Sequence, residues 1–161
     1  MSKLTGLSLF SNVGVAEAYF KEIGVSIVLA NELLEERARF YSDVYKETEM
    51  ICGDITDENI RRTIVEKAKE LGVDFIIATP PCQGMSKLGS MDPNDVRNRL
   101  IYYAVEVIKK VNPKYILIEN VPQILNTKVV VNGKTMLIPD YLHEELGESY
   151  NINDDPRIKA M

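Results

Sequence analysis

The chain of 161 residues has little of the chemistry that cysteine and histidine provide. It contains two cysteines, Cys52 and Cys82, and one histidine, His143. It has no Cys-x-x-Cys pair and no Cys/His cluster, so we expect neither a metal site nor a disulfide framework. A Ser-His or Cys-His catalytic pair is disfavoured because His143 is the only imidazole. Acid–base chemistry would therefore fall to carboxylates.

The sequence also lacks long apolar runs and an excess of positive charge. No apolar stretch approaches the roughly 20 residues of a membrane span, and the N-terminus has no signal-peptide layout. We therefore expect a cytoplasmic chain with no membrane partner. The net charge of −5 argues against a freestanding nucleic-acid binder. A local basic patch or a partner chain could still hold nucleic acid.

What the sequence does contain is a regular alternation of strand and helix patterns. The expected strands are residues 4–10, 25–30, 50–52, 74–78 and 115–118, of which the last two read as buried. The expected helices are residues 15–23, 34–45, 57–71 and 96–111, with Gly24 and Gly72 as stops for the first and third. This alternation predicts one α/β domain, 1–161, with a doubly wound, mostly parallel, Rossmann-like sheet.

The pattern changes after residue 122. Two apolar stretches, 128–131 and 134–137, flank Asn132-Gly133 and predict a hairpin with a type I′ turn. A short helix is expected at 140–146, and a sixth strand could start at 150–152. Residues 84–94 are rich in Gly, Ser, Met and Asp without a clear period, so we expect a mobile loop there.

The stretch from Asp74 to Gly84 carries the first candidate for chemistry. Its apolar strand ends at Pro80-Pro81, because proline cannot donate to a strand ladder. Cys82 is thus expected at the carboxyl end of a central strand, where ligands bind in open α/β sheets. Position alone leaves a reactive thiol and a packing thiol equally open.

The first three strand ends suggest an adenosine-type ligand. A turn with Gly14 leads toward a helix N-terminus, and Glu32 and Asp54 end the next two strands. Glu32 could instead be a surface carboxylate, and capping by Thr56 or Asp57 is the plainer interpretation of the region around Asp54. The turn lacks the glycines of a GxGxxG pattern, which favours a cofactor without a diphosphate over NAD.

The fourth and fifth strand ends carry Cys82 and Glu119. Adjacent parallel strands place their ends close together, so a thiol and a carboxyl group would face one pocket. Glu119 could act as an acid if the site encloses it. A capping or sheet-edge carboxylate is the alternative. The thiol would need its surroundings to favour the thiolate.

Pro81-Cys82-Gln83 and Glu119-Asn120-Val121 resemble the two catalytic motifs of the cytosine-C5 DNA methyltransferases. Four further segments resemble other motifs of this family in the same order: 9–14, 31–32, 53–55 and 95–100. The resemblance covers nearly the whole chain. It implies a Rossmann-like methyltransferase fold and a restriction-modification type of enzyme in the prokaryotic cytosol or nucleoid.

The resemblance implies S-adenosyl-L-methionine as cofactor and S-adenosyl-L-homocysteine as product. Phe10 and Ile55 would flank the adenine, with Leu33 on its other side. Glu32 would hold the ribose hydroxyls, and Asp54 the adenine amino group. The remaining cofactor contacts that it implies are Ser11, Asn12, Val13, Gly14, Pro80 and Leu100, the last at the methionine end.

The resemblance further implies a cytosine flipped out of duplex DNA as substrate. Cys82 would add to C6 of the ring, and Glu119 would hold or protonate N3, after which C5 takes the methyl group. Gln83, Ser86 and Arg97 would meet the DNA near the flipped base, and loop 84–94 would close over it. Cys52 would be a dispensable, small buried residue.

The chain departs from the family at two motif glycines, replaced by Asn12 and Val15, and it lacks the later QxRxR motif, the target-recognition region and a final helix. We therefore expect a cofactor-binding and catalytic part that is incomplete at its C-terminus, as a split-enzyme subunit with a second protein chain or as a truncated product. The alternatives are a tRNA cytosine-C5 methyltransferase relative, a non-catalytic cofactor-binding partner or remnant, and a Rossmann-type oxidoreductase.

Overall fold

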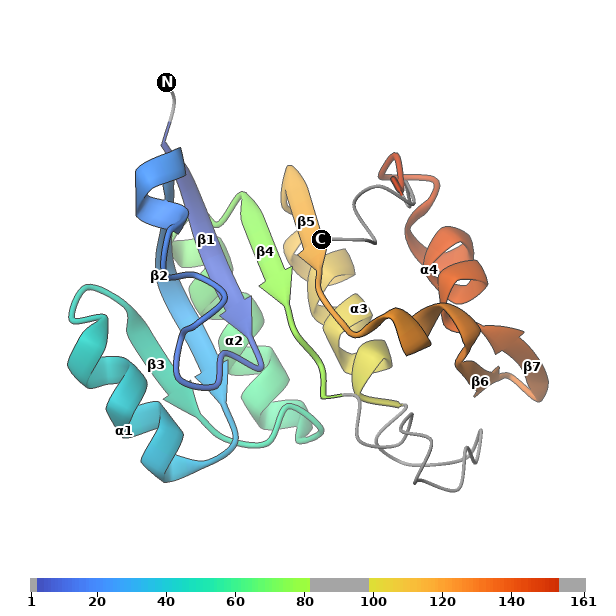
Figure 1. The fold of residues 1–161 in the computed structure, drawn as a ribbon, viewed down its shortest axis with the longest axis horizontal. Coiled ribbons are helices and arrows are strands. Elements are labelled where there is room, and N and C mark those ends of the chain that lie inside the picture. Colours follow the sequence, from blue (N-terminus) through green and yellow to red (C-terminus); the bar gives the residue numbers. More distant parts are fainter. Residues whose placement is uncertain (1–2, 82–98, 154–161) are drawn as a thin grey trace. The chain divides into compact units, whose positions relative to one another are not determined.

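The computed structural model describes residues 3–81 and 99–153 of the chain. A five-stranded parallel sheet in the order β3-β2-β1-β4-β5 dominates it (Figure 1). Its strands are β1 (Leu4–Leu9), β2 (Val25–Glu32), β3 (Glu49–Cys52), β4 (Phe75–Ala78) and β5 (Tyr115–Ile118). The predicted doubly wound α/β class is therefore confirmed, with five strands close to their expected positions.

The described chain divides into two compact units. The first comprises 1–80 and 106–119 and holds the whole parallel sheet, and the second comprises 81–105 and 120–161. None of the helices in the described ranges is long and apolar enough to cross a membrane.

Two helices of the first unit connect its strands, α1 (Glu35–Val44) and α2 (Glu58–Glu70). Figure 1 shows α2 behind the strands and the segment between β1 and β2 in front of them. Tyr41 and Tyr45 tie α1 to that segment through hydrogen bonds from their hydroxyls to the Glu17 carboxylate and to the Gly14 carbonyl. Burial near Glu17 raises the pKa of Tyr41, so its hydroxyl stays protonated and donates at neutral pH.

Helix α2 shows how local sequence sets the element boundaries. Asp57 is its N-cap, and the carboxylate accepts a hydrogen bond from Asn59 N–H at 2.7 Å. Acidic Glu58 begins the helix and basic side chains occupy its last turn, which complements the helix dipole. Gly72 follows the helix with a φ of 64°, a left-handed conformation that glycine adopts readily.

The core of the first unit lies around the central strands β1 and β4. All four residues of β4 are buried, as the continuous apolar run predicted. Ile77 is 1% exposed, and Leu7, Leu9 and Ile76 are fully buried. Phe20 packs edge-on against Phe75, with ring centroids 5.6 Å apart. The strand that leads to Pro80-Pro81 is thus held from both faces.

The predicted helix at 15–23 is wrong. The segment consists of turns followed by a single 3-10 turn, η1 (Phe20–Ile23), although Gly24 does close it in the expected left-handed conformation. Val15, Tyr19 and Ile23, which share one face at helical spacing, are all strongly exposed. A short helix depends on packing of its apolar face for stability, and the described chain does not cover this face.

The prediction that β5 is buried is also wrong. Tyr115 is 57% exposed and Leu117 42% exposed, so one face of the strand is open. Among the described strands β5 pairs only with β4, which leaves it at the edge of the sheet. Apolar periodicity identified the strand correctly but did not reveal which faces are covered.

The second unit contains η3 (Pro122–Asn126), the hairpin β6 (Lys128–Val131) and β7 (Lys134–Leu137), and α4 (Ile138–Leu146). Asn132 and Gly133 both have a positive φ, as the predicted type I′ turn requires. Tyr102 on α3 (Leu100–Val111) donates its hydroxyl to Val130 O and packs against Tyr141. The strand predicted at 150–152 is not formed, because this segment finds no pairing partner among the described strands.

Because β4 is buried and β5 is exposed on one face, we expect truncations in the two strands to differ in their effect on stability. Ile77 and Leu117 are register partners on these strands, but only Ile77 is buried. We expect Ile77→Ala to lower the free energy of unfolding by about 2–5 kcal/mol, because it opens a cavity in the core. Leu117→Ala should cost no more than about 1 kcal/mol. Urea unfolding of both variants tests this, and equal losses would contradict the exposure of β5.

Candidate active site

The residues predicted at the strand ends of the first unit lie at one edge of the sheet. Strand pairing aligns Leu9 with both Asn31 and Ala78, and Ala78 with Ile118. The carboxyl ends of β1, β2, β4 and β5 therefore lie side by side, and β3 ends beside Glu32. Phe10–Gly14, Glu32, Asp54, Pro80 and Glu119 each follow or end one of these strands, so the topology brings them to a common edge.

The loop after β1 has a tightly wound backbone. Phe10, Asn12 and Gly14 have φ values of 59°, 52° and 82°, all in the left-handed region. Asparagine tolerates this region better than most residues with a side chain. Asn12 can therefore adopt a left-handed conformation of the kind that a motif glycine would allow. Val15, the other replacement, has no positive φ and its side chain is 77% exposed, so no glycine is needed there.

Gly14 is required for space as well as for its φ. A Cβ atom built at this position would lie 2.2 Å from the Tyr45 ring, which is far closer than atoms can approach. The Tyr45 hydroxyl donates to the carbonyl of the same glycine. The close packing of α1 on the loop therefore depends on the missing side chain.

Glu32 is a buried carboxylate, only 5% exposed, and not the surface carboxylate that the sequence left open. One oxygen accepts the Asn12 N–H and the other accepts the Leu34 N–H, both at 2.9 Å. The carboxylate thus fixes the loop after β1 and the start of α1 at once. Because a carboxylate can accept about four hydrogen bonds, each oxygen keeps capacity for a further donor such as a sugar hydroxyl.

Two polar side chains that we did not predict as site residues also tie the strand ends together. Asn31 donates to the carbonyls of Ile51 and Gly53, which joins the ends of β2 and β3. Thr79 donates its hydroxyl to Phe10 O, which joins the end of β4 to the loop after β1. In the sequence, Asn31 and Thr79 could have been recognised as polar residues at the carboxyl end of otherwise apolar strands.

The loop after β3 presents Asp54 to solvent. Its carboxylate accepts the Thr56 N–H at 2.8 Å, while the helix cap is Asp57. Ile55 beside it is buried, and Leu33 at the end of β2 is 58% exposed. Cys52 is exposed rather than buried as we expected, because its side chain lies at the sheet edge, where its thiol is 3.8 Å from Leu33 O.

These side chains fit an adenosine moiety. Leu33 offers an exposed apolar surface, Glu32 has acceptor capacity for hydroxyl groups, and Asp54 is an exposed acceptor for an amino group. The hydroxyl oxygen of Ser11 is buried and has no hydrogen-bond partner in the part of the chain that the structure describes. A polar group of a cofactor could satisfy this atom of the loop.

Of the predicted catalytic pair, only Glu119 lies among the described residues. Glu119 follows β5, and its N–H donates to Ala78 O at 3.0 Å, which fixes its backbone to the end of β4. Its side chain is exposed, so the described residues do not form the enclosure that we expected. Cys82, Gln83, Ser86, Arg97 and loop 84–94 lie outside the described residues. Their placement stays a prediction.

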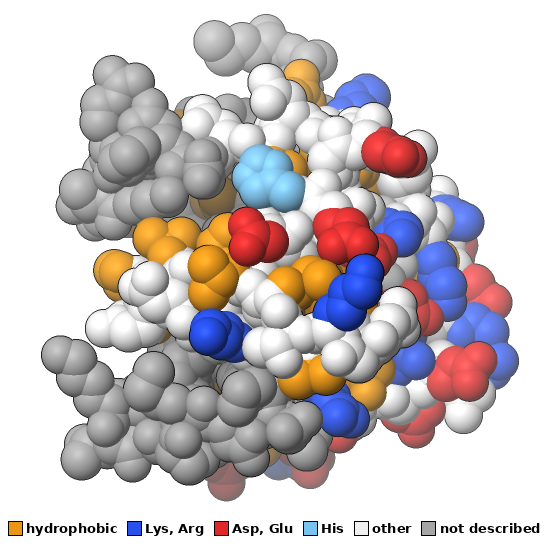
Figure 2. All heavy atoms as spheres, turned by 90° about the vertical axis from the view of Figure 1, so that its right-hand side faces the viewer, with side chains coloured by type: hydrophobic (Ala, Val, Ile, Leu, Met, Phe, Trp, Pro, Cys, Tyr) orange, Lys and Arg blue, Asp and Glu red, His pale blue; other side chains and the backbone are white. Residues whose placement is uncertain are grey.

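The other predicted contacts fall into both units. Pro80 is buried at the end of the first unit, and Leu100 is half-buried at the start of α3, in the second. Over residues 3–81 and 99–153 there is no group of acidic, histidine or cysteine side chains that could hold a metal ion. On the face shown in Figure 2, the acidic and basic side chains of the described residues are interspersed rather than gathered into one basic patch.

The chain is similar to one family of proteins along most of its length. A family model described as C-5 cytosine-specific DNA methylase matches residues 4–152. The Type II methyltransferase M1.HgaI of Avibacterium volantium is 43% identical over 157 residues, covering 94% of this chain and 44% of that protein. The Type II methyltransferase M.FnuDI of Fusobacterium nucleatum is 31% identical, covering 91% of this chain and 39% of that protein. The chain spans about two fifths of the length of these relatives.

Solved structures share the fold. A mutant of Spodoptera frugiperda DNMT2 matches with a TM-score of 0.65 and 25% identity, covering 91% of this chain and 41% of that chain. A prophage-encoded E. coli protein, described as a DNA modification methyltransferase, matches with a TM-score of 0.73 and 23% identity, covering 94% of this chain and 40% of the other. The parallel sheet and its helices thus have the Rossmann-like methyltransferase fold.

The left-handed conformation of Asn12 should determine which substitutions the loop tolerates. Asn12→Gly should change the free energy of unfolding by less than about 1 kcal/mol, whereas Asn12→Val should lower it by about 1–2 kcal/mol, because a β-branched residue resists a positive φ. Asn112 has the same conformation after α3, with a φ of 55°, and provides the control.

Asn112→Val should destabilise the chain by a similar amount, because the same left-handed conformation is required there. Urea unfolding of both valine variants tests this. If Asn12→Val is as stable as the wild type, the loop is not held in the conformation described.

Proposed function

Because the chain belongs to the C-5 cytosine-specific DNA methylase family, we propose that it is the cofactor-binding and catalytic part of an S-adenosylmethionine-dependent DNA (cytosine-5-)-methyltransferase. The observation that carries the proposal is the buried Glu32 carboxylate, which organises the loop after β1 and keeps acceptor capacity at the sheet edge. Bacterial Type II methyltransferases among the relatives support a restriction-modification role in the prokaryotic cytosol or nucleoid.

The cofactor is proposed to lie along the carboxyl edge of the first unit. Glu32 accepts hydrogen bonds from the ribose hydroxyls and Asp54 accepts one from the adenine amino group. The adenine packs against Leu33, with Phe10 and Ile55 on its other side. The remaining proposed cofactor contacts are Ser11–Gly14, Pro80 and Leu100. When bound, S-adenosylmethionine supplies an electrophilic methyl group and leaves as S-adenosylhomocysteine.

The chain's own residues prepare the cytosine to accept that methyl group. The Cys82 thiolate adds to C6 while Glu119 donates a proton to N3, which places electron density on C5. C5 would then take the methyl group, solvent water would carry away the C5 proton, and the C6–S bond would break to release Cys82 as thiolate. Glu119 recovers its proton from N3 in the same step, so the enzyme returns to its starting state.

Duplex DNA is the proposed substrate, with the target base flipped out because its ring is otherwise unreachable. Gln83, Ser86 and Arg97 are proposed to contact DNA near that base. The net charge of −5 implies that most of the basic surface lies elsewhere. A second protein chain that carries the recognition region is a further part of the proposal. The exposed Tyr115 and Leu117 of edge strand β5 offer it an apolar surface.

The nucleophile is tested by substitution at both cysteines. In the enzyme completed by its recognition region, Cys82→Ser should lower methyl transfer by at least about a thousandfold, because a serine hydroxyl is a far weaker nucleophile than a thiolate. Cys52→Ser is the matched control and should retain most of the activity. Mass spectrometry should detect a covalent adduct with 5-fluorocytosine DNA in the Cys52 variant only. An adduct with the Cys82 variant would rule out the proposed role.

The need for a partner is tested with the isolated chain. We expect it to bind S-adenosylhomocysteine in calorimetric titration and not NAD, yet to show no appreciable methyl transfer to mixed-sequence DNA. Binding of NAD in its place would support an oxidoreductase, and neither ligand binding would overturn the cofactor assignment. Robust turnover would overturn the dependence on a second chain, and methylation of tRNA alone would overturn the DNA substrate.

A further inference from the structure

We propose that Arg61 is a positioning residue that sets the adenine end of the cofactor site, by holding the 53–57 loop against helix α3 through Glu106. Arg61 lies on α2, outside the motif segments, and its side chain reaches the 53–57 loop at the Ile55 carbonyl. The inference rests on the proposed function, because it assigns Asp54 and Ile55 to the adenine.

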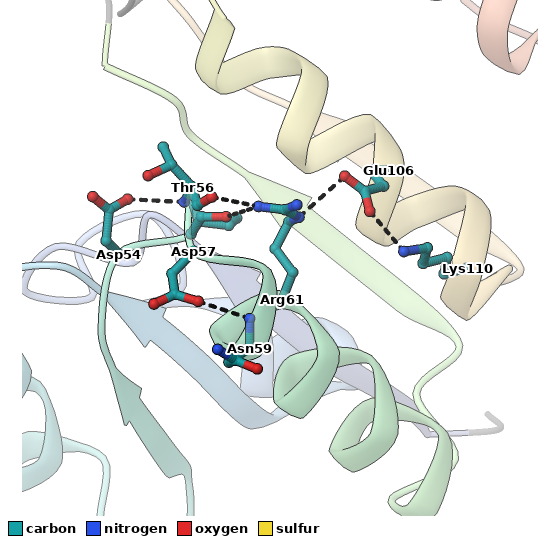
Figure 3. A network of polar contacts seen from close by, with 8 residues as sticks. Asp54, Thr56, Asp57, Asn59, Arg61, Glu106 and Lys110 are labelled. Atoms are coloured by element: carbon teal, nitrogen blue, oxygen red, sulfur yellow. Dashed lines mark hydrogen bonds and ion pairs between the residues drawn. The ribbon is translucent and has the colours of Figure 1, made fainter.

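Arg61 holds the 53–57 loop through two hydrogen bonds. Its Nη1 donates to the carbonyls of Ile55 and Thr56, at 3.0 and 2.7 Å (Figure 3). Two bonds from a charged donor to successive carbonyls fix the orientation of the peptide unit between them. The same peptide follows Asp54, whose carboxylate accepts the Thr56 N–H at 2.8 Å. The direction of the Asp54 side chain is therefore coupled to the position of Arg61.

Glu106 on α3 anchors the Arg61 guanidinium. The Nε of Arg61 lies 3.0 Å from a carboxylate oxygen of Glu106, and the Arg61 side chain is only 12% exposed. The other oxygen of Glu106 pairs with Lys110 at 2.6 Å. The bond from Lys110, with the Arg61 charge adding to it, lowers the pKa of Glu106 and keeps it ionised at neutral pH. Glu106 thus binds the Arg61 guanidinium on the side opposite to the loop.

The guanidinium group is suited to this task in a way that lysine is not. It is planar and carries donors that point in several fixed directions, so one side chain can reach two carbonyls and a carboxylate at the same time. A lysine ammonium concentrates its donors at one point, so it could reach the loop carbonyls or Glu106 but would not bridge them.

Arg62 provides a matched control on the same helix. Its guanidinium donates to Asn59 Oδ1 within α2 at 2.8 Å, and its side chain is exposed. Arg61→Met and Arg62→Met therefore remove the same charge from neighbouring positions. Arg61→Lys and Glu106→Gln serve as milder variants if Arg61→Met does not fold.

The experiment compares two ligands in the full chain by calorimetric titration. S-Adenosylhomocysteine carries the adenine amino group, and S-inosylhomocysteine carries an oxo group in its place. The wild type should prefer the first by about tenfold or more through Asp54. Arg61→Met should reduce this preference to less than about twofold, Arg61→Lys and Glu106→Gln should reduce it in part, and Arg62→Met should keep it. A general loss of stability would weaken both ligands and leave the ratio unchanged, which would overturn the inference.

A second measurement does not depend on any ligand. The N–H groups of Thr56 and Asp57 bond within the loop, to the side chain and the carbonyl of Asp54. Hydrogen exchange at these two amides should accelerate about tenfold or more in Arg61→Met and not in Arg62→Met. Unchanged exchange overturns the role of Arg61, whether or not the cofactor binds. Absence of S-adenosylhomocysteine binding to the wild type, with exchange altered as expected, overturns only the proposed function.

Discussion

The site depends above all on one buried carboxylate, that of Glu32. Its two oxygens accept N–H groups from Asn12 and Leu34, which belong to different segments. A buried carboxylate is costly unless such donors compensate for lost water. The same two bonds that make its burial tolerable also fix the loop after β1 and the start of α1. Removing this charge would therefore disturb the shape of the edge as well as its chemistry.

The other connections at the sheet edge follow the same logic. Asn31, Thr79 and Arg61 each donate to backbone carbonyls at or just beyond strand ends, where the ladder no longer satisfies them. Each bond is modest, yet together they hold four strand ends and two loops in register. The functional edge is thus built from side chain to backbone bonds, while the apolar core of β1 and β4 beneath it supplies the rigid base.

Periodicity and turn chemistry were sufficient to predict much of the fold. The buried run of β4 and the Asn132-Gly133 turn have local causes and were predicted, and Asp57 was one of the two caps that the sequence offered for α2. The helix at 15–23 and the burial of β5 depend instead on what covers Val15 or Leu117, and a pattern of apolar residues does not contain that information. The role of Arg61 depends on contacts with residues distant along the chain, and none of these leaves a motif. The strand-end positions of Glu32 and Asp54 were predictable because parallel topology alone brings them together.

The open edge of β5 affects how the chain behaves at high concentration. Among the described strands β5 pairs on one side only and exposes Tyr115 and Leu117 on one face, so its edge is a template on which another strand can assemble. A complementing chain of the kind proposed would compete for that edge with copies of this chain. Synthesis of such a chain in the same cell would then favour the mixed pairing, and solubility would report on it.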